Sequence, residues 1–273
     1  YYRCSVENND LKFAGYFWRV VRINGNGSIR MIYDGTSAHA NGESSTDRQY
    51  GASQFNPNYN NNMYVGYMYT SGEAHGTGTS STIKNNTDKF YTDKLSSYAS
   101  KLDTNAGFCS DRSTLNLQNG VGTGTVITYN KGYLRVVEST PTLTCENASD
   151  YYTVASSSSG NKKLSYPIGL ITADEVMLAG HAGGVFDGSY NHMKTNNGSY
   201  LVTRNVFWTM TPAGGYNPFG NSGWSALLFP VTGSGLIDDF GANGAFGLRP
   251  VINIRSDVII TGTGSQNDPY LVN

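Results

Sequence analysis

Histidine and cysteine side chains are the natural starting point, because they act as nucleophiles, proton carriers and metal ligands near neutral pH. The four histidines lie in polar, loop-like sequence, and none has a partner at the spacing that aligns two ligands on one helix face. They are His39, His75, His181 and His192. The sequence therefore predicts no histidine metal site.

Nucleophile motifs are present only in fragments. Gly233-Ser234-Gly235 lacks the outer positions of the Gly-x-Ser-x-Gly elbow. Cys109 lies in a Gly-Phe-Cys-Ser-Asp context that is more typical of half a disulfide than of a nucleophile. We therefore expect no catalytic residue and no enzyme. A pocket that grouped Arg249 or His181 with two acidic residues would favour the opposite view.

Acidic residues leave one open alternative. The carboxylates of Asp174-Glu175, Asp187 and Asp238-Asp239, together with many Asn carbonyls, could form the oxygen cage that calcium requires. Solvated loop carboxylates are the commoner arrangement. The glycine-rich run at 120–124 has neither the Lys nor the following helix of a phosphate-binding loop. We expect no cofactor, with calcium as the alternative.

Three cysteines make an odd count. Cys109 and Cys145 flank a segment rich in Gly, Thr and Asn, and a disulfide between them would close a long excursion of the chain. Cys4 would then be left without a partner. Three buried free thiols are the alternative. A disulfide would place the protein in an oxidising, extracellular compartment.

Composition agrees with an extracellular location. The 273 residues include 33 Gly and 20 Tyr, only 14% are charged, and the net charge is −1. Such a surface offers no attraction for nucleic acid or anionic lipid. There is neither a secretory signal nor an apolar run that could span a bilayer. We interpret the chain as a cell-surface ectodomain that a missing upstream segment attaches to the membrane or wall.

The elements that would position these residues begin with a hairpin. Aromatic and β-branched residues predict a strand at 12–23, and alternation resumes at 28–33 after the turn Asn24-Gly25-Asn26-Gly27. Residues 36–80 predict irregular loops with a short strand at 63–69. Ser81 begins a helix with its apolar residues on one face.

A loop-rich insertion is predicted at 103–166, with a minor hairpin formed by 125–129 and 133–137. Thr172 and Glu175 then form a capping box at the start of a short helix that ends before Gly180. Further strands are predicted at 200–211, 224–231, 235–240, 246–254, 258–260 and 270–272. The pattern indicates a single α+β domain, 1–273, with a mostly antiparallel sheet.

Two motifs in the C-terminal third carry a family resemblance. Phe207-Trp208-Thr209-Met210-Thr211-Pro212 is followed, after a Gly/Asn/aromatic segment, by Gly247-Leu248-Arg249-Pro250-Val251-Ile252-Asn253-Ile254. This pair resembles the formylglycine-generating-enzyme-type branch of the C-type lectin fold. The blocks 13–24, 107–113, 166–175 and 262–270 are similar to those of surface proteins from gut Gram-positive bacteria.

We expect the distinctive residues of these motifs to stabilise the fold and not to bind a ligand. Trp18 and Trp208 offer large apolar areas to the core. Pro212 cannot donate to a ladder and is expected to end its strand. Arg249 is expected to bind loop carbonyls or a carboxylate through its several donors. Formylglycine-generating enzymes use a C-terminal cysteine pair, whereas no cysteine follows Cys145, so the resemblance does not extend to that activity.

The fold also resembles the variable proteins of diversity-generating retroelements, which display a diversified C-terminal segment. The corresponding ligand-display segment here is 213–243, whose mixture of aromatic and small polar residues is typical of binding surfaces. Its candidate ligand-binding residues are Tyr216, Asn217, Phe219, Asn221, Trp224, Asp238, Asp239 and Asn243. Leu228 and Phe240, in the same segment, are expected in the core.

These observations support an extracellular ligand-binding protein, receptor-like or adhesin-like. Its ligand would be a protein or glycan on another cell or on a phage or host surface, bound by aromatic anchors within a polar rim. The alternative is a structural subunit of a pilus or surface layer, with its loops packed against neighbouring subunits.

Overall fold

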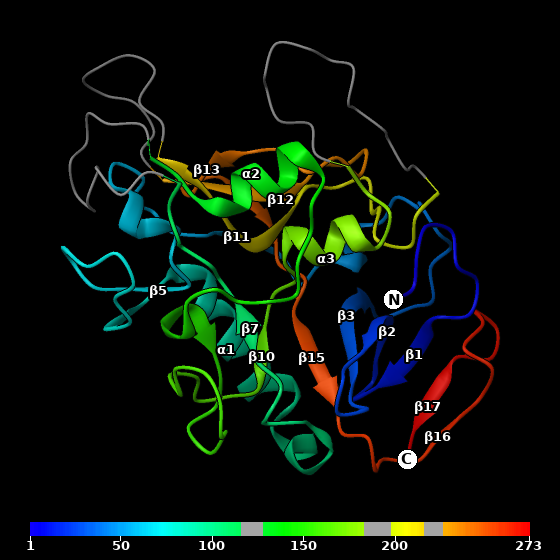
Figure 1. The fold of residues 1–273 in the computed structure, drawn as a ribbon. Helices are drawn as coiled ribbons and strands as arrows, with labels where there is room; N and C mark the ends of the chain where they lie inside the picture. The colour runs from blue at the N-terminus through cyan, green and yellow to red at the C-terminus, as the bar shows by residue number, and fades with distance from the viewer. Residues whose placement is uncertain (116–127, 183–197, 216–225) are drawn as a thin grey trace.

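The structure is a computed structural model that describes residues 1–115, 128–182, 198–215 and 226–273 (Figure 1). Two larger sheets dominate it, one of seven strands and one of six, and helices are few. Most neighbouring strands are antiparallel; β1 with β17 and β11 with β14 are parallel. The predicted mixed α+β class with a mostly antiparallel sheet is therefore confirmed.

The seven-stranded sheet brings the two ends of the chain together. Its strand order is β10-β15-β3-β2-β1-β17-β16. The strands are β1 (Asp10–Phe13), β2 (Tyr16–Ile23), β3 (Ile29–Gly35), β10 (Ile168–Gly169), β15 (Val251–Ile254), β16 (Ile260–Thr261) and β17 (Tyr270–Val272). Because the C-terminal β17 lies beside the N-terminal β1, both termini lie near this sheet (Figure 1).

The first predicted strand is in fact two. Residues 12–23 are divided by a tight turn in which Ala14 and Gly15 have φ angles of 53° and 82°. Two successive residues with positive φ form the backbone that joins right-twisted antiparallel strands. The hydrophobic run does not reveal the turn, because Ala14 has no turn-forming side chain. The predicted Asn-Gly hairpin is confirmed, with the Asn24 amide donating to the Ser28 carbonyl at 2.8 Å.

The six-stranded sheet corrects several predicted strands. It consists of β4 (Ala52–Gln54), β8 (Thr128–Tyr129), β11 (Phe207–Gly215), β12 (Leu227–Val231), β13 (Phe240–Gly241) and β14 (Ala245–Gly247). The strand predicted at 200–211 begins only at Phe207. Of the strand predicted at 235–240, only Phe240 lies in a strand, β13, and Ile237 forms an isolated bridge to Val231. The one predicted at 246–254 is divided between the two large sheets, as β14 and β15.

The prediction that Pro212 ends its strand was wrong. β11 continues to Gly215, and the pairing of β11 with β12 shifts register on either side of Pro212. The missing proline N–H is therefore accommodated by an irregularity in the ladder. Two small sheets pair β5 (Met68–Tyr69) with β6 (Thr79–Ser80), and β7 (Phe108–Cys109) with β9 (Tyr151–Tyr152).

The helices are short, and side chains cap the N-termini of α1 (Thr82–Lys94) and α3 (Ala173–Leu178). α1 begins as predicted after Ser81, whose side chain accepts from the Lys84 amide. α3 has the predicted capping box of Thr172 and Glu175. The predicted minor hairpin was wrong, because its second strand, 133–137, lies within a helix, α2 (Lys131–Glu138). The strand predicted at 63–69 begins instead with a 3₁₀ turn, Asn62–Val65, and only Met68–Tyr69 lie in a strand, β5.

Both core tryptophans are fully buried, as expected. Trp18 has edge contacts with Tyr33 and Phe90, at centroid distances of 5.8 and 6.2 Å. Trp208 packs against Phe55 at 5.7 Å and donates its indole N–H to the Ser53 carbonyl at 2.8 Å. Each tryptophan therefore fills the core while its polar atom is satisfied.

Arg249 has the structural role expected of it. It is fully buried and donates to the Tyr33 and Leu201 carbonyls at 3.0 and 2.9 Å and to the Asp34 carboxylate at 2.7 Å. Arg19 and Arg48 bind the same carboxylate at 2.9 and 2.8 Å. This network joins β2 and β3 to the start of β15 and to a 3₁₀ turn at Thr46–Arg48.

No helix within the described parts of the chain is both long enough and apolar enough to cross a bilayer.

Candidate functional site

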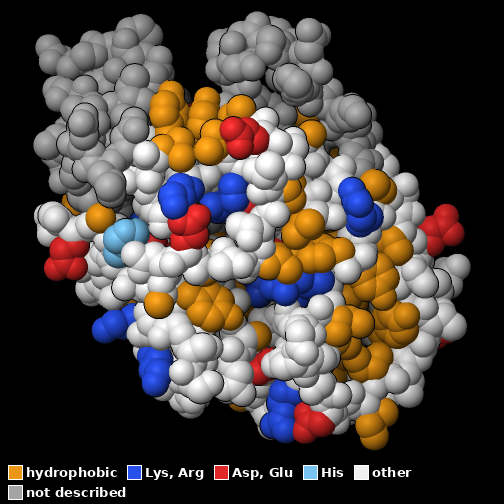
Figure 2. Space-filling model, viewed as in Figure 1, with side chains coloured by type: hydrophobic (Ala, Val, Ile, Leu, Met, Phe, Trp, Pro, Cys, Tyr) orange, Lys and Arg blue, Asp and Glu red, His pale blue; other side chains and the backbone are white. Residues whose placement is uncertain are grey.

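A cavity of about 270 Å³ opens where five chain segments meet. They are the β2–β3 hairpin, the segment at 105–111, α2, the loop at 142–144 and the start of α3; Tyr151 and Thr211, from two strands, add one residue each. α2 and α3 lie over β11 and β12 in Figure 1, and in the same view of the surface basic side chains occupy the centre of the face among hydrophobic ones (Figure 2). The cavity lining is mostly polar.

One charged cluster in the cavity wall is formed by two arginines from the hairpin. Arg22 on β2 and Arg30 on β3 are directly opposite each other in the ladder. Both bind Glu175, with Nε–Oε1 distances of 3.0 Å for Arg22 and 2.6 Å for Arg30. Like charges opposite one another in a sheet repel unless a counter-charge lies between them. The buried Glu175, from the capping box of α3, supplies that charge.

The electrostatics of Glu175 follow from these contacts. Burial acts to raise the pKa of Glu175, but Arg30 and Arg22 outweigh it and hold that pKa below its ordinary value. Arg30 is itself fixed by the Gly107 carbonyl at 3.2 Å and by the Phe108 ring, 4.6 Å from its guanidinium carbon. Glu175 is thus a permanently ionised anchor near neutral pH.

A second charged cluster in the cavity wall is formed by one arginine and two carboxylates. Arg135 on α2 binds Asp174 through Nε and Nη2, at 2.7 and 3.2 Å, and Asp111 through Nη1 at 3.1 Å. Asp174 also accepts from the backbone amide of Thr142 at 3.0 Å. These bonds hold the 142–144 loop, α2 and α3 together around the cavity.

Uncharged polar groups complete the wall. They come from Asn24, Asn26, Asn105, Thr142, Thr144, Tyr151 and Thr211. The Tyr151 hydroxyl accepts from the Gly107 amide at 3.1 Å, and the Asn26 side chain donates to Asp103 at 2.8 Å. The Asn105 side chain is exposed and has no protein partner among the described residues. Amides and hydroxyls of this kind suit a ligand rich in hydrogen-bonding groups.

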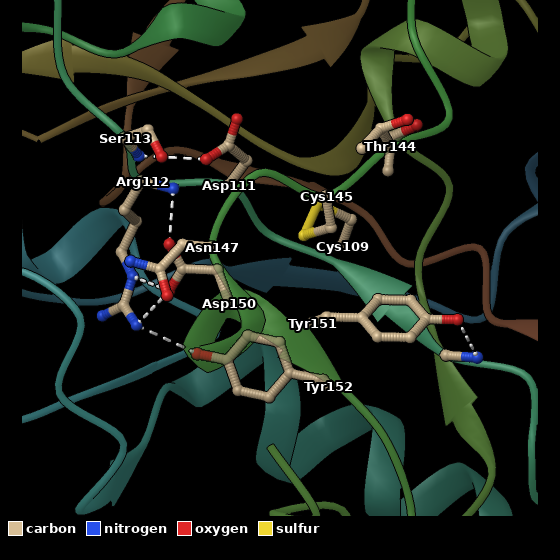
Figure 3. The surroundings of a disulfide bond; sticks show 12 residues. Cys109, Asp111, Arg112, Ser113, Thr144, Cys145, Asn147, Asp150, Tyr151 and Tyr152 are labelled. Carbon is tan, nitrogen blue, oxygen red and sulfur yellow. Dashed lines mark hydrogen bonds and ion pairs between the residues drawn. A yellow bond between two sulfur atoms is a disulfide. The ribbon is translucent and has the colours of Figure 1, made fainter. Parts of the chain in front are cut away.

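The disulfide predicted between Cys109 and Cys145 is present (Figure 3). Cys109 lines the cavity and Cys145 directly follows the 142–144 loop, so the bond attaches that loop to β7. Next to it the buried Arg112 binds Asp150 through Nε at 2.8 Å. Cys4 is a free, exposed thiol.

The predicted display segment is only partly described. Tyr216, Asn217, Phe219, Asn221 and Trp224 lie outside the described residues. Asp238, Asp239 and Asn243 are half-buried and follow β12; they do not line the cavity. Burial raises the pKa of Asp238 and of Asp239. The structure therefore does not bring these three residues together with the charged cavity.

The two hydrophobic residues of that segment differ in burial. Leu228 is fully buried, as expected. Phe240 is 36% exposed, so its expected place in the core was wrong. It lies at the sheet edge on β13 and packs its ring edge-on against Phe246 at 5.2 Å.

The histidines have separate surroundings. His181 is buried between the Gly235 carbonyl and the Ser199 hydroxyl, each at 2.7 Å, and burial lowers its pKa. His39 contacts Glu43 and Asp47, and His75 contacts Asp150. His192 lies outside the described residues. Neither His181 nor Arg249 lines the charged cavity.

The calcium alternative depends on the carboxylates of Asp174-Glu175, Asp187 and Asp238-Asp239, together with Asn carbonyls. Asp187 lies outside the described parts of the chain, and the carboxylates of Asp174 and Glu175 are bound by arginines. Among the described residues, no three His, Cys, Asp or Glu side chains are grouped to hold a metal ion.

Sequence reasoning missed the charged cavity. Its principal residues are Arg22, Arg30, Asp111, Arg135, Asp174 and Glu175, of which only the last two had been considered, as calcium ligands. One signal was available: the Asn-Gly turn places Arg22 and Arg30 opposite each other, which requires a nearby acid. The sequence does not indicate that this acid is Glu175, which lies more than 140 residues after Arg30 in the chain.

Comparison with protein-family models, with characterised proteins and with solved structures found no match for this chain.

Proposed function

We propose that this chain is an extracellular ligand-binding domain, receptor-like or adhesin-like, and not an enzyme. The observation that carries the proposal is the polar cavity in which every carboxylate is held by an arginine. A general acid or base needs a pKa near the working pH, whereas the pKa of Glu175 is held low. Fixed charges and uncharged donors support binding rather than proton transfer.

We also propose that the domain has a C-type-lectin-like fold of the formylglycine-generating-enzyme type. β11, which contains Trp208, lies between β12 and β14, and β15, which follows Arg249, lies between β10 and β3; neither motif strand is at a sheet edge, which supports this assignment. On this view, residues 213–243 form a second, variable contact surface of the kind found in diversity-generating retroelements. The disulfide supports display on the cell surface.

A binding screen tests the function. The purified chain is applied to a glycan array and to a panel of surface proteins, each with and without a chelator, because calcium dependence is part of the question. We expect saturable binding to at least one member of either panel, unchanged by the chelator. No binding in any arm would reject the proposal.

Two sets of variants then separate the cavity from the display segment. Asn105→Ala removes an exposed amide at the cavity, and Asn58→Ala removes an exposed amide elsewhere as the control. The double variant Tyr216→Ala with Trp224→Ala tests the display segment and should leave the melting temperature nearly unchanged. Loss of binding in the first variant assigns the ligand to the cavity, and loss in the double variant assigns it to the segment.

A structural subunit of a pilus or surface layer is the second candidate, favoured by one observation. Ile259, which directly precedes the edge strand β16, and Leu271, on the neighbouring β17, are 70% and 42% exposed, and β16 has no further neighbour among the described strands. Exposed apolar edge strands promote pairing between chains. Concentration-dependent assembly that Ile259→Asn abolishes would support this role, and a monomer at all concentrations would exclude it.

A further inference from the structure

The charges that line the cavity cancel in total but are unevenly distributed. Three guanidinium groups face three carboxylates. In the hairpin cluster, Arg22 and Arg30 share the single charge of Glu175, which leaves one positive charge in excess. In the α2 cluster, Arg135 is shared by Asp111 and Asp174, which leaves one negative charge in excess. The hairpin cluster therefore has an excess positive charge and the α2 cluster has an excess negative charge; these clusters are named the positive end and the negative end of the site.

Each end has unused hydrogen-bonding capacity. Arg22 uses only Nε in its bond to Glu175, and its two terminal nitrogens have no hydrogen-bond partner among the described residues. Two parallel donors of this kind match the geometry of a carboxylate. At the negative end, Oδ2 of Asp111 and Oδ2 of Asp174 each accept one bond, from Arg135. A carboxylate oxygen can accept two, so an ammonium group can be bound there.

We propose that this cavity binds a small zwitterion, such as a free amino acid or short peptide, with its carboxylate at Arg22 and its ammonium group toward Asp111 and Asp174. The proposal rests on the ligand-binding function proposed above and specifies the ligand class of the same cavity. A purely anionic or cationic ligand would satisfy one end and leave the other facing a like charge. Such juxtaposition is a common source of specificity against the wrong partner.

The size and the wall of the cavity agree with such a ligand. A volume of about 270 Å³ accommodates a molecule of a few residues. Asn105 and Thr144 offer an amide and a hydroxyl in the same wall, which can bind a peptide bond or a polar side chain. The charged walls are held in place by ion pairs and by the disulfide, so little ordering is required on binding.

Calorimetric titration with four forms of one dipeptide tests the charge pattern. The probes are L-alanyl-L-alanine with free ends, its N-acetylated form, its C-amidated form and the form blocked at both ends. Free alanine and the tripeptide extend the series of charge separations. We expect at least one free-ended member to bind ten-fold or more tightly than its singly blocked forms. Equal binding of all forms, or no binding of any, overturns the proposal.

Arg22→Gln tests the positive end. This change should weaken the free-ended dipeptide about ten-fold and leave the C-amidated form unaffected, because that form has no carboxylate. Arg255→Gln is the matched control, since Arg255 also binds one carboxylate through Nε but is exposed and does not line the cavity. If both forms of the dipeptide lose affinity equally, Arg22 is not the carboxylate site. Thermal unfolding verifies that each variant is folded. The dipeptide titrations on the unaltered protein test the proposal even if a variant does not fold.

The two proposals fail differently. If the array and protein panels give ligands but no zwitterionic probe binds, the ligand class is wrong and the binding function stands. If the panels are negative as well, the binding function fails too.

Discussion

Buried arginines in this protein are organised around shared carboxylates. Asp34 accepts from Arg19, Arg48 and Arg249, and Glu175 binds Arg22 and Arg30. Burial acts to raise the pKa of Asp34, but the three arginines outweigh it and hold that pKa below its ordinary value. Removing one member of such a network leaves buried charges without a counter-charge. The resulting loss of folding stability exceeds the net stabilisation that the intact network provides.

Glu175→Gln tests this cost. The two arginines would lose their common counter-charge, so we expect the free energy of unfolding to fall by about 3–5 kcal/mol in urea titrations. Glu146→Gln is the control, because Glu146 forms an exposed ion pair with Lys131 and should change stability by less than about 1 kcal/mol. Similar losses for the two variants would contradict the role assigned to Glu175.

Asp10 makes the stability depend on pH in the direction opposite to Asp34 and Glu175, because its pKa is raised and theirs are lowered. Burial raises the pKa of Asp10 to about 6, against the lowering effect of Arg19. The folded state therefore favours the protonated carboxyl, and this contribution is complete below the ordinary pKa and is lost as the pH rises through 6. We expect unfolding free energy to decrease by about 1–3 kcal/mol between pH 4 and pH 7 from this group.

Asp10→Asn isolates that contribution, because the amide mimics the protonated carboxyl and still accepts from Arg19. Urea unfolding at several pH values should show a flatter profile between pH 4 and pH 7 for the variant. Asp34 and Glu175, whose pKa values are lowered, lose their contributions only as the pH falls further into acid. An unchanged profile in the variant would show that Asp10 is ionised throughout.

At the scale of elements, the tight β1–β2 turn contains an unfavourable residue. Ala14 has φ 53°, a left-handed conformation that costs a residue with a Cβ about 1 kcal/mol. Ala14→Gly should therefore raise the free energy of unfolding by about 0.5–1 kcal/mol. Ala52→Gly, in the exposed part of β4, is expected to have the opposite sign, because glycine weakens a strand. Chemical denaturation of both variants distinguishes the turn effect from a general effect of glycine.

At the scale of the whole molecule, the disulfide closes a segment of 36 residues. Replacing Cys109 and Cys145 by Ser should reduce the free energy of unfolding by about 4 kcal/mol, on the chain-entropy model. The same change releases the 142–144 loop from β7, so affinity for a cavity ligand should fall while the two sheets persist. Cys4→Ser is the control, since that thiol is free. Unaltered affinity in the double variant would show that the loop is held without the disulfide.

Local patterns were sufficient for several features of this protein. The Asn24–Gly27 turn, the Ser81 cap of α1 and the Thr172–Glu175 capping box depend on residues within a few positions of one another, so their types and spacing predict them. The burial of Trp18 and Trp208 and the Cys109–Cys145 pairing also followed from residue type and context. The α+β class follows from the sum of such elements.

The tertiary structure decided what depends on residues far apart in the chain. Hydrophobic continuity concealed the turn at Ala14–Gly15, and only pairing with different partners divides β14 from β15. The segment predicted as a strand at 133–137 is helical, with the exposed apolar residues Leu134 and Val137 on α2. The charged cavity combines the β2–β3 hairpin with α2 and α3. Because Coulomb interactions and packing depend on distance in space, no local spacing specifies which acid meets which arginine.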